Sequence, residues 1–115
     1  MITLPTDASK LNPQGATVDF FNFQEKDIHY YYFDTSLRAA PEPMVNAMVG
    51  LNMIKDNDNK LVMINHQKPM GLFNKLLETF DVQTFELDDG NYQMVFSYKE
   101  GLSEQADLSD SHCSG

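Results

Sequence analysis

The sequence is poor in cysteine and in positive charge, and it has no long hydrophobic run. Its one cysteine, Cys113, has no partner for a disulfide within the chain. No apolar stretch approaches the roughly 20 residues that a helix needs to cross a bilayer. The N-terminus also lacks the basic and then apolar pattern of a secretory signal. These absences predict a cytoplasmic protein without a membrane partner.

Acidic residues outnumber basic ones by about two to one. Lys and Arg together number 8 and Asp and Glu number 17, which gives a formal net charge of −9. A chain with this charge repels phosphate backbones and anionic lipid headgroups, so nucleic acid is disfavoured as a partner. With 115 residues, the chain has the length of one domain with a modest core.

The first 28 residues are expected to form an N-terminal extension. Residues 1–16 mix Pro, Gly, Asn and Ser with few apolar side chains, which predicts no regular structure. Residues 17–23 are aromatic and β-prone, and they form either an added edge strand or an aromatic cover over an apolar patch. The three phenylalanines of this segment can equally well close a homodimer.

Residues 29–55 predict a strand followed by a helix. His29–Phe33 carries aromatic side chains on both faces, as expected of a covered strand. From Pro41 onward, apolar residues recur with the spacing of one helical stripe, up to the turn-forming residues 56–59. The stripe comprises Met44, Ala47, Met48 and Leu51. It predicts a helix to about Lys55 whose methionines fill the core rather than bind copper.

The following segments predict a second strand, a second helix and a hairpin. Leu61–Ile64 is a short unbroken apolar run, typical of a buried parallel strand. Pro69 opens a predicted helix that reaches Phe80, with an apolar residue at every third or fourth position. Residues 82–87 and 92–98 alternate in polarity around a turn, which predicts a hairpin.

Together these elements predict an α/β fold, an α+β two-layer sandwich in the order β-α-β-α-β-β. Its four strands form a mixed sheet, and both helices lie on one face of that sheet. The domain spans residues 29–99. Residues 100–115 are acidic and rich in small residues, without a large apolar stripe, so they are expected to form a flexible tail.

Two proline motifs mark the expected helix starts. In Ala40-Pro41-Glu42-Pro43 the prolines pre-set φ for a first helical turn, where their missing N–H groups cost nothing. This motif resembles the Cys-Pro-x-Pro motif of the TusA/SirA-like sulfur-carrier family, and the resemblance covers about residues 29–98. Ala40 stands where that family has its persulfide-carrying cysteine. The chain is therefore similar to the cysteine-lacking, TusA-related branch of uncharacterised domains, which have the His-x-x-Pro seen here as His66-Gln67-Lys68-Pro69. The resemblance implies the same sandwich without sulfur relay at position 40.

One edge of the predicted sheet collects the ends of both parallel strands and the starts of both helices. Ligands of α/β sheets bind at such edges, and helix N-termini favour anions. The residues expected at this edge are Arg38, Ala40, Pro41, Glu42, Pro43, Asn65, His66, Lys68 and Pro69. They predict a non-enzymatic accessory or binding domain that recognises a partner protein or a small anion. The alternative is that these residues only start helices and cap loops.

Two further functions stay open at this point. A sulfur-transfer or redox protein would use Cys113 of the tail. The tail residues that could also bind a soft metal are Asp107, Asp110, His112 and Cys113. An enzyme would use His66 as acid or base, with Thr35 or Ser36 as a nucleophile. The domain itself has no cysteine and histidine pattern of a metal site and no glycine-rich phosphate loop, so we expect no cofactor.

Overall fold

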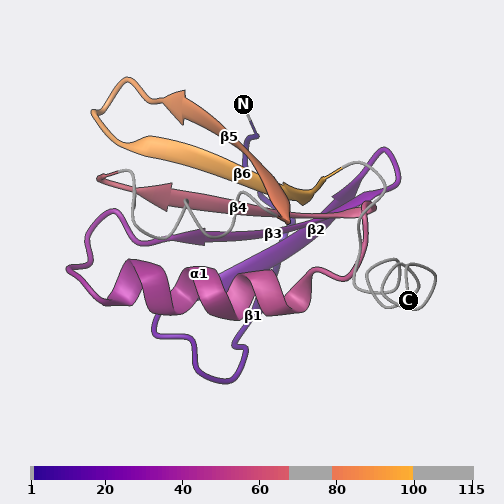
Figure 1. The fold of residues 1–115 in the computed structure, drawn as a ribbon, viewed down its shortest axis with the longest axis horizontal. Helices are drawn as coiled ribbons and strands as arrows, with labels where there is room; N and C mark the ends of the chain where they lie inside the picture. The colour runs from indigo at the N-terminus through magenta and orange to yellow at the C-terminus, as the bar shows by residue number, and fades with distance from the viewer. Residues whose placement is uncertain (1, 68–78, 100–115) are drawn as a thin grey trace, which may run out of the picture.

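The computed structural model describes residues 2–67 and 79–99. Its elements are β1 (Ser9–Leu11), β2 (Phe20–Glu25), β3 (Ile28–Asp34), α1 (Glu42–Met53), β4 (Asn59–Asn65), β5 (Phe80–Glu86) and β6 (Tyr92–Tyr98). The strands form one six-stranded sheet in the order β1-β2-β3-β4-β6-β5, and α1 lies along one face of it (Figure 1). In this sheet β3 and β4 are parallel and all other neighbours are antiparallel. No helix in the described ranges is long and apolar enough to cross a membrane.

The predicted fold class, four strands with two helices, is wrong. The described part of the chain is a mostly-β, mixed six-stranded sheet with a single helix. The sheet is larger than predicted because β1 and β2 add two strands ahead of the predicted core. Residues 1–16 therefore contain a strand, and residues 20–23 of the aromatic segment enter the sheet inside its edge, since β1 pairs with the outer side of β2. Most of the second predicted helix, from Pro69, lies outside the described residues. Its expected last residue, Phe80, begins β5 and pairs with β6.

The centre of the core is formed by side chains of β2, β3 and β4 that face α1. Phe33 of β3 pairs with Phe20 of β2 and with Met63 of β4. The rings of Phe20 and Phe33 stack with their centroids 4.8 Å apart, and all three side chains are fully buried. They belong to the same buried cluster as Ala47 and Leu51 of α1. The strand predicted at residues 29–33 and the one predicted at 61–64 are confirmed, each as the middle of a longer strand.

Helix α1 buries a different stripe from the one expected. Its buried residues are Pro43, Asn46, Ala47, Gly50 and Leu51. Ala47 and Leu51 match the prediction, whereas Met44 and Met48 are 46% and 44% exposed, so the prediction that these methionines fill the core is wrong. The stripe is rotated towards small residues because the helix lies close to β4. A Cβ atom on Gly50 would come within 2.5 Å of Cδ1 of Leu61.

A buried asparagine joins α1 to the segment that leads into β2. Oδ1 of Asn46 accepts a hydrogen bond from the backbone N–H of Thr17 at 2.9 Å. Its Nδ2 donates to Thr17 Oγ1 and to the Glu42 carbonyl oxygen, both at 2.8 Å. Asn46 has no exposed surface, and these three bonds satisfy both ends of its amide. The segment before β2 is thereby fixed beside the helix.

We expect Asn46→Ala to lower the free energy of unfolding by about 2 kcal/mol, because it removes three hydrogen bonds and leaves a cavity at a buried position. Thr17→Val keeps the asparagine but removes one of these bonds and the exposed bond that Thr17 Oγ1 donates to Glu42 Oε1, so it should cost about 1 kcal/mol. Urea denaturation followed by circular dichroism measures both values. If Asn46→Ala cost less than about 0.5 kcal/mol, the connection between α1 and the segment before β2 would not stabilise the fold.

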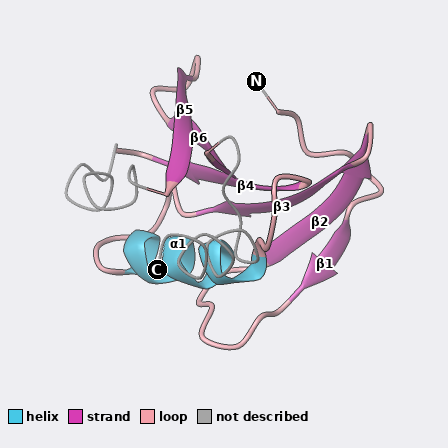
Figure 2. Ribbon diagram, turned by 45° about the vertical axis from the view of Figure 1, so that its right-hand side comes forward, coloured by secondary structure: helices cyan, strands magenta, loops and turns pink. Residues whose placement is uncertain are grey.

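The N-terminal segment lies on the face of the sheet opposite α1 (Figure 2). The Ile2 N–H donates to Gln93 Oε1 at 2.7 Å, and Gln93 Nε2 donates to the Ile2 carbonyl oxygen at 2.6 Å. Gln93 precedes the core residue Met94 on β6, so its side chain points to this opposite face. It is 2% exposed, although it is polar. The predicted N-terminal extension therefore takes part in the fold through a pair of partly buried hydrogen bonds.

β5 and β6 form the predicted hairpin. Their register runs from Phe80 opposite Tyr98 to Glu86 opposite Tyr92. Gly90 in the connecting turn adopts a φ of +88°, a left-handed conformation that favours glycine. The prediction of a hairpin around this turn is confirmed.

Candidate functional site

A small cleft lies between the start of α1 and the end of β4, and we call it the Pro41–His66 cleft. Its lining residues are Ala40, Pro41, Pro43, Met44, Asn65, His66 and Gln67, and its volume is about 270 Å³. The two segments meet because β3 and β4 are parallel, so that the start of the helix after β3 and the end of β4 share one end of the sheet. Ala40, two prolines and Met44 make one wall apolar.

Buried polar side chains hold the β4 end of this cleft in place. Thr35 Oγ1 lies 3.0 Å from the carbonyl oxygen of Ile64 and 3.1 Å from Oδ1 of Asn65. Nδ2 of Asn65 donates to the carbonyl oxygen of Gln67 at 2.8 Å. Thr35 and Asn65 are 0% and 3% exposed, so their bonds form in a dry environment. The turn that carries the exposed His66 is therefore pre-organised.

The structure brings five of the predicted site residues together in the Pro41–His66 cleft, namely Ala40, Pro41, Pro43, Asn65 and His66. Arg38 and Glu42 do not line it. Their side chains pair with each other, with Nη1 3.8 Å from Oε1, on the surface beside it. Lys68 and Pro69 lie outside the described residues, and so does Cys113. Of the charged residues predicted for this edge, the two that the structure describes, Arg38 and Glu42, therefore do not line the cleft.

The start of α1 is already occupied by groups of the chain itself. Glu42 puts a carboxylate in the first turn, where negative charge complements the helix dipole. The Glu42 N–H donates to the carbonyl oxygen of Ala39 at 3.1 Å, and Pro43 has no N–H to offer. A small anion at this helix start would meet the carboxylate of Glu42 and few free donors.

Neither predicted nucleophile faces the Pro41–His66 cleft. The Thr35 hydroxyl is buried against the end of β4. Ser36 lines a different cleft, and its N–H donates to Oδ1 of Asp34 at 2.8 Å. Nucleophilic catalysis needs a nucleophile within hydrogen-bond reach of its base, and His66 has neither of these two as a partner. Among the described residues no group of three His, Cys, Asp or Glu side chains is placed to hold a metal ion.

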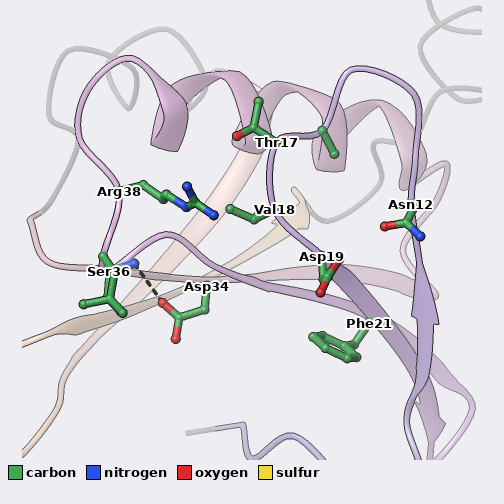
Figure 3. Close-up of a pocket in the computed structure, with 10 residues that line it drawn as sticks. Asn12, Thr17, Val18, Asp19, Phe21, Asp34, Ser36 and Arg38 are labelled. Atoms are coloured by element: carbon green, nitrogen blue, oxygen red, sulfur yellow. Dashed lines mark hydrogen bonds between the residues drawn. The ribbon is translucent and has the colours of Figure 1, made fainter.

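A larger and more polar cleft opens where β2 begins and β3 ends, and we call it the β2–β3 cleft (Figure 3). Its volume is about 690 Å³, and its lining residues are Asn12, Ala16, Thr17, Val18, Asp19, Phe21, Asp34, Ser36, Leu37 and Arg38. Figure 3 shows the carboxylates of Asp19 and Asp34 and the ring of Phe21 on the side of the strands away from α1. Arg38 lies nearer the helix. One side of this cleft is therefore acidic and aromatic.

Aromatic residues form a ladder on this side of β2 and β3. Phe21 pairs with Tyr32 and Phe23 pairs with Tyr30, and the rings of the second pair stack with centroids 5.0 Å apart. Burial raises the pKa of Tyr32, and the negative charge of Asp34 raises that pKa further. The negative charge of Asp34 therefore disfavours ionisation of the Tyr32 hydroxyl in the neighbouring Phe21–Tyr32 pair.

The β2–β3 cleft was not predicted from the sequence. Asp19 precedes Phe21 by two residues and Asp34 follows Tyr32 by two, which is the spacing of side chains on one face of a strand. This signal is present in the sequence. It indicates a shared site only when β2 and β3 are known to be antiparallel neighbours with Phe21 opposite Tyr32.

Comparison with known proteins gives no family for this chain, because no family model, no curated protein and no solved structure matches it. The resemblance to the TusA/SirA-like family therefore stays a prediction. The six-stranded sheet differs from the four-stranded sandwich that the resemblance implied.

Proposed function

We propose that this chain is a non-enzymatic binding domain that recognises a partner protein at the Pro41–His66 cleft. The observation that supports this function best is a hollow of about 270 Å³ with an apolar wall that continues onto an exposed apolar part of α1. Met44 lines the hollow and is 46% exposed, and Met48 follows one turn later at 44%. Thioether side chains are flexible and adapt to the apolar groups of a partner.

A protein side chain suits this cleft better than a small anion, which was the other predicted ligand. His66 is the one titratable residue of the described lining, and Arg38 pairs with Glu42 outside the cleft. Glu42 also adds negative charge at the start of α1. An anion would gain little here, whereas an apolar side chain of a partner gains free energy by leaving water.

The other functions stay predictions from the sequence. Sulfur transfer would depend on Cys113, which lies outside the described residues. Catalysis would depend on a partner for His66, and neither Thr35 nor Ser36 takes that place. A homodimer is one form of protein partner that the proposal includes. The cytoplasmic location and the expected lack of a cofactor also stay predictions.

Capture from a lysate of the source cells tests this proposal. The full chain is immobilised, and bound proteins are measured by quantitative mass spectrometry. We expect the proteins enriched by the wild type to be lost with Met44→Asp, which puts a charge into the apolar wall, and to be reduced with His66→Ala. Val45→Asp is the matched control, because Val45 is 39% exposed and adjacent in sequence but does not line the cleft.

Two outcomes contradict the proposal, one of this capture experiment and one of an NMR titration of the isotope-labelled chain. Equal loss of the captured proteins with Val45→Asp would show that charge on α1, rather than the cleft, decides binding. Saturable shifts of the Ala40, Asn65 and His66 resonances on titration with inorganic phosphate would replace the protein partner by a small anion.

A further inference from the structure

We propose that the β2–β3 cleft is a second binding site, and that it receives an arginine or lysine side chain from a basic segment of a partner protein. The cleft shares no described lining residue with the Pro41–His66 cleft. The two sites are therefore separable by substitution, and this one does not depend on the function proposed above.

Two carboxylates from neighbouring strands supply its negative charge. Asp19 and Asp34 flank the Phe20–Phe33 pair that ends the β2–β3 register, and both side chains line the cleft. Asp19 Oδ2 lies 3.5 Å from Lys10 Nζ, but both side chains are more than half exposed (53% and 57%), so water and salt weaken this pair. Within the described residues Asp34 has no ion-pair partner, and its Oδ1 accepts the Ser36 N–H. A cationic side chain inside the cleft is attracted by both carboxylates.

The aromatic ladder selects the kind of cation. Phe21 lines the cleft and pairs with Tyr32, and the Phe23–Tyr30 pair follows two residues further along the strands, about 6.8 Å away. The face of an aromatic ring attracts a guanidinium or ammonium group. The ring also covers the aliphatic stem of an arginine or lysine, which a bare metal ion does not have. Carboxylates next to rings therefore favour a basic side chain.

The size and charge of the surroundings favour a peptide segment as the source of that side chain. A net charge of −9 attracts basic segments and repels acidic ones. The cleft, at about 690 Å³, is larger than one side chain, and the side chains of Asn12 and Ser36 line it with groups that can hydrogen-bond a peptide backbone. Arg38, the cationic residue of the described lining, lies on the helix side and pairs with Glu42.

The test is an NMR titration of the isotope-labelled full chain with a blocked hexapeptide of alternating arginine and glycine. We expect saturable amide shifts at residues 17–21 and 32–38. Asp19→Asn/Asp34→Asn should raise the dissociation constant by at least about tenfold, because it removes both charges and keeps the oxygen that accepts the Ser36 bond. Phe21→Leu should raise the dissociation constant by about threefold, since it removes the ring and keeps an apolar side chain.

A second double variant separates this site from general attraction by an acidic protein. Asp81→Asn/Asp88→Asn changes the net charge by the same amount at two exposed residues that do not line the cleft. It should change the dissociation constant by less than about twofold, because exposed charges at a distance are screened. Equal weakening by the two double variants, shifts centred on other residues, or unchanged affinity in Phe21→Leu would overturn the proposal. Far-UV circular dichroism confirms that each variant is folded.

Discussion

Ala47→Asp is expected to lower the free energy of unfolding by at least about 3 kcal/mol, because it places an unpaired carboxylate between α1 and the sheet. Ala47 has no exposed surface and belongs to the central core cluster. Met48→Asp, at the next residue, should change this free energy by less than about 1 kcal/mol, since Met48 is 44% exposed. Urea denaturation at neutral pH, followed by circular dichroism, measures both values.

This pair of variants isolates burial from other effects. Both introduce the same side chain and the same charge at adjacent positions of one helix, so helix propensity and net charge contribute almost equally to the two. A larger loss for Met48→Asp than for Ala47→Asp would mean that α1 packs with its methionines towards the sheet, as the sequence predicts. A larger loss for Ala47→Asp supports the rotated stripe.

The existence of α1 was predictable, and its orientation was not. Prolines at 41 and 43 and the turn at residues 56–59 bound the helix, and the structure places it at Glu42–Met53. Its stripe was misplaced because Met44 and Met48 fit the helical period as well as the true stripe does. The true stripe includes Asn46 and Gly50, which no hydrophobic pattern identifies as buried. Asn46 is buried because its amide bonds to Thr17, a contact across 29 residues.

The sheet and the site show the same division between local and long-range information. His29–Phe33 and the hairpin were predicted from their own residues, whereas β1 was missed because Ser9–Leu11 has a single clear apolar residue and depends on its pairing with β2. The Pro41–His66 cleft was predictable because parallel strands bring their ends together. The β2–β3 cleft depends on a register that the sequence does not reveal.

Gly50→Val is expected to lower the free energy of unfolding by about 2 to 3 kcal/mol through a direct clash. A single Cβ at this position already comes within 2.5 Å of Cδ1 and 2.8 Å of Cδ2 of Leu61, and valine adds two carbons more. Leu61 is fully buried between Tyr31 of β3 and Phe96 of β6, which leaves it little room to move. Glycine is a poor helix former, so a substitution limited only by propensity would stabilise the protein instead.

The origin of this loss can be separated from backbone strain by two further variants. Gly90→Ala changes a glycine with a φ of +88° and nothing within 4 Å, so it should cost about 1 kcal/mol through conformation alone. Leu61→Ala should cost about 3 kcal/mol in the wild type, but it opens space beside residue 50. We therefore expect the double variant Gly50→Val/Leu61→Ala to lose at least about 1 kcal/mol less free energy of unfolding than the sum of the two single losses. Strictly additive losses would show that the helix and β4 are not in contact at Gly50 and Leu61, and that α1 lies further from the sheet.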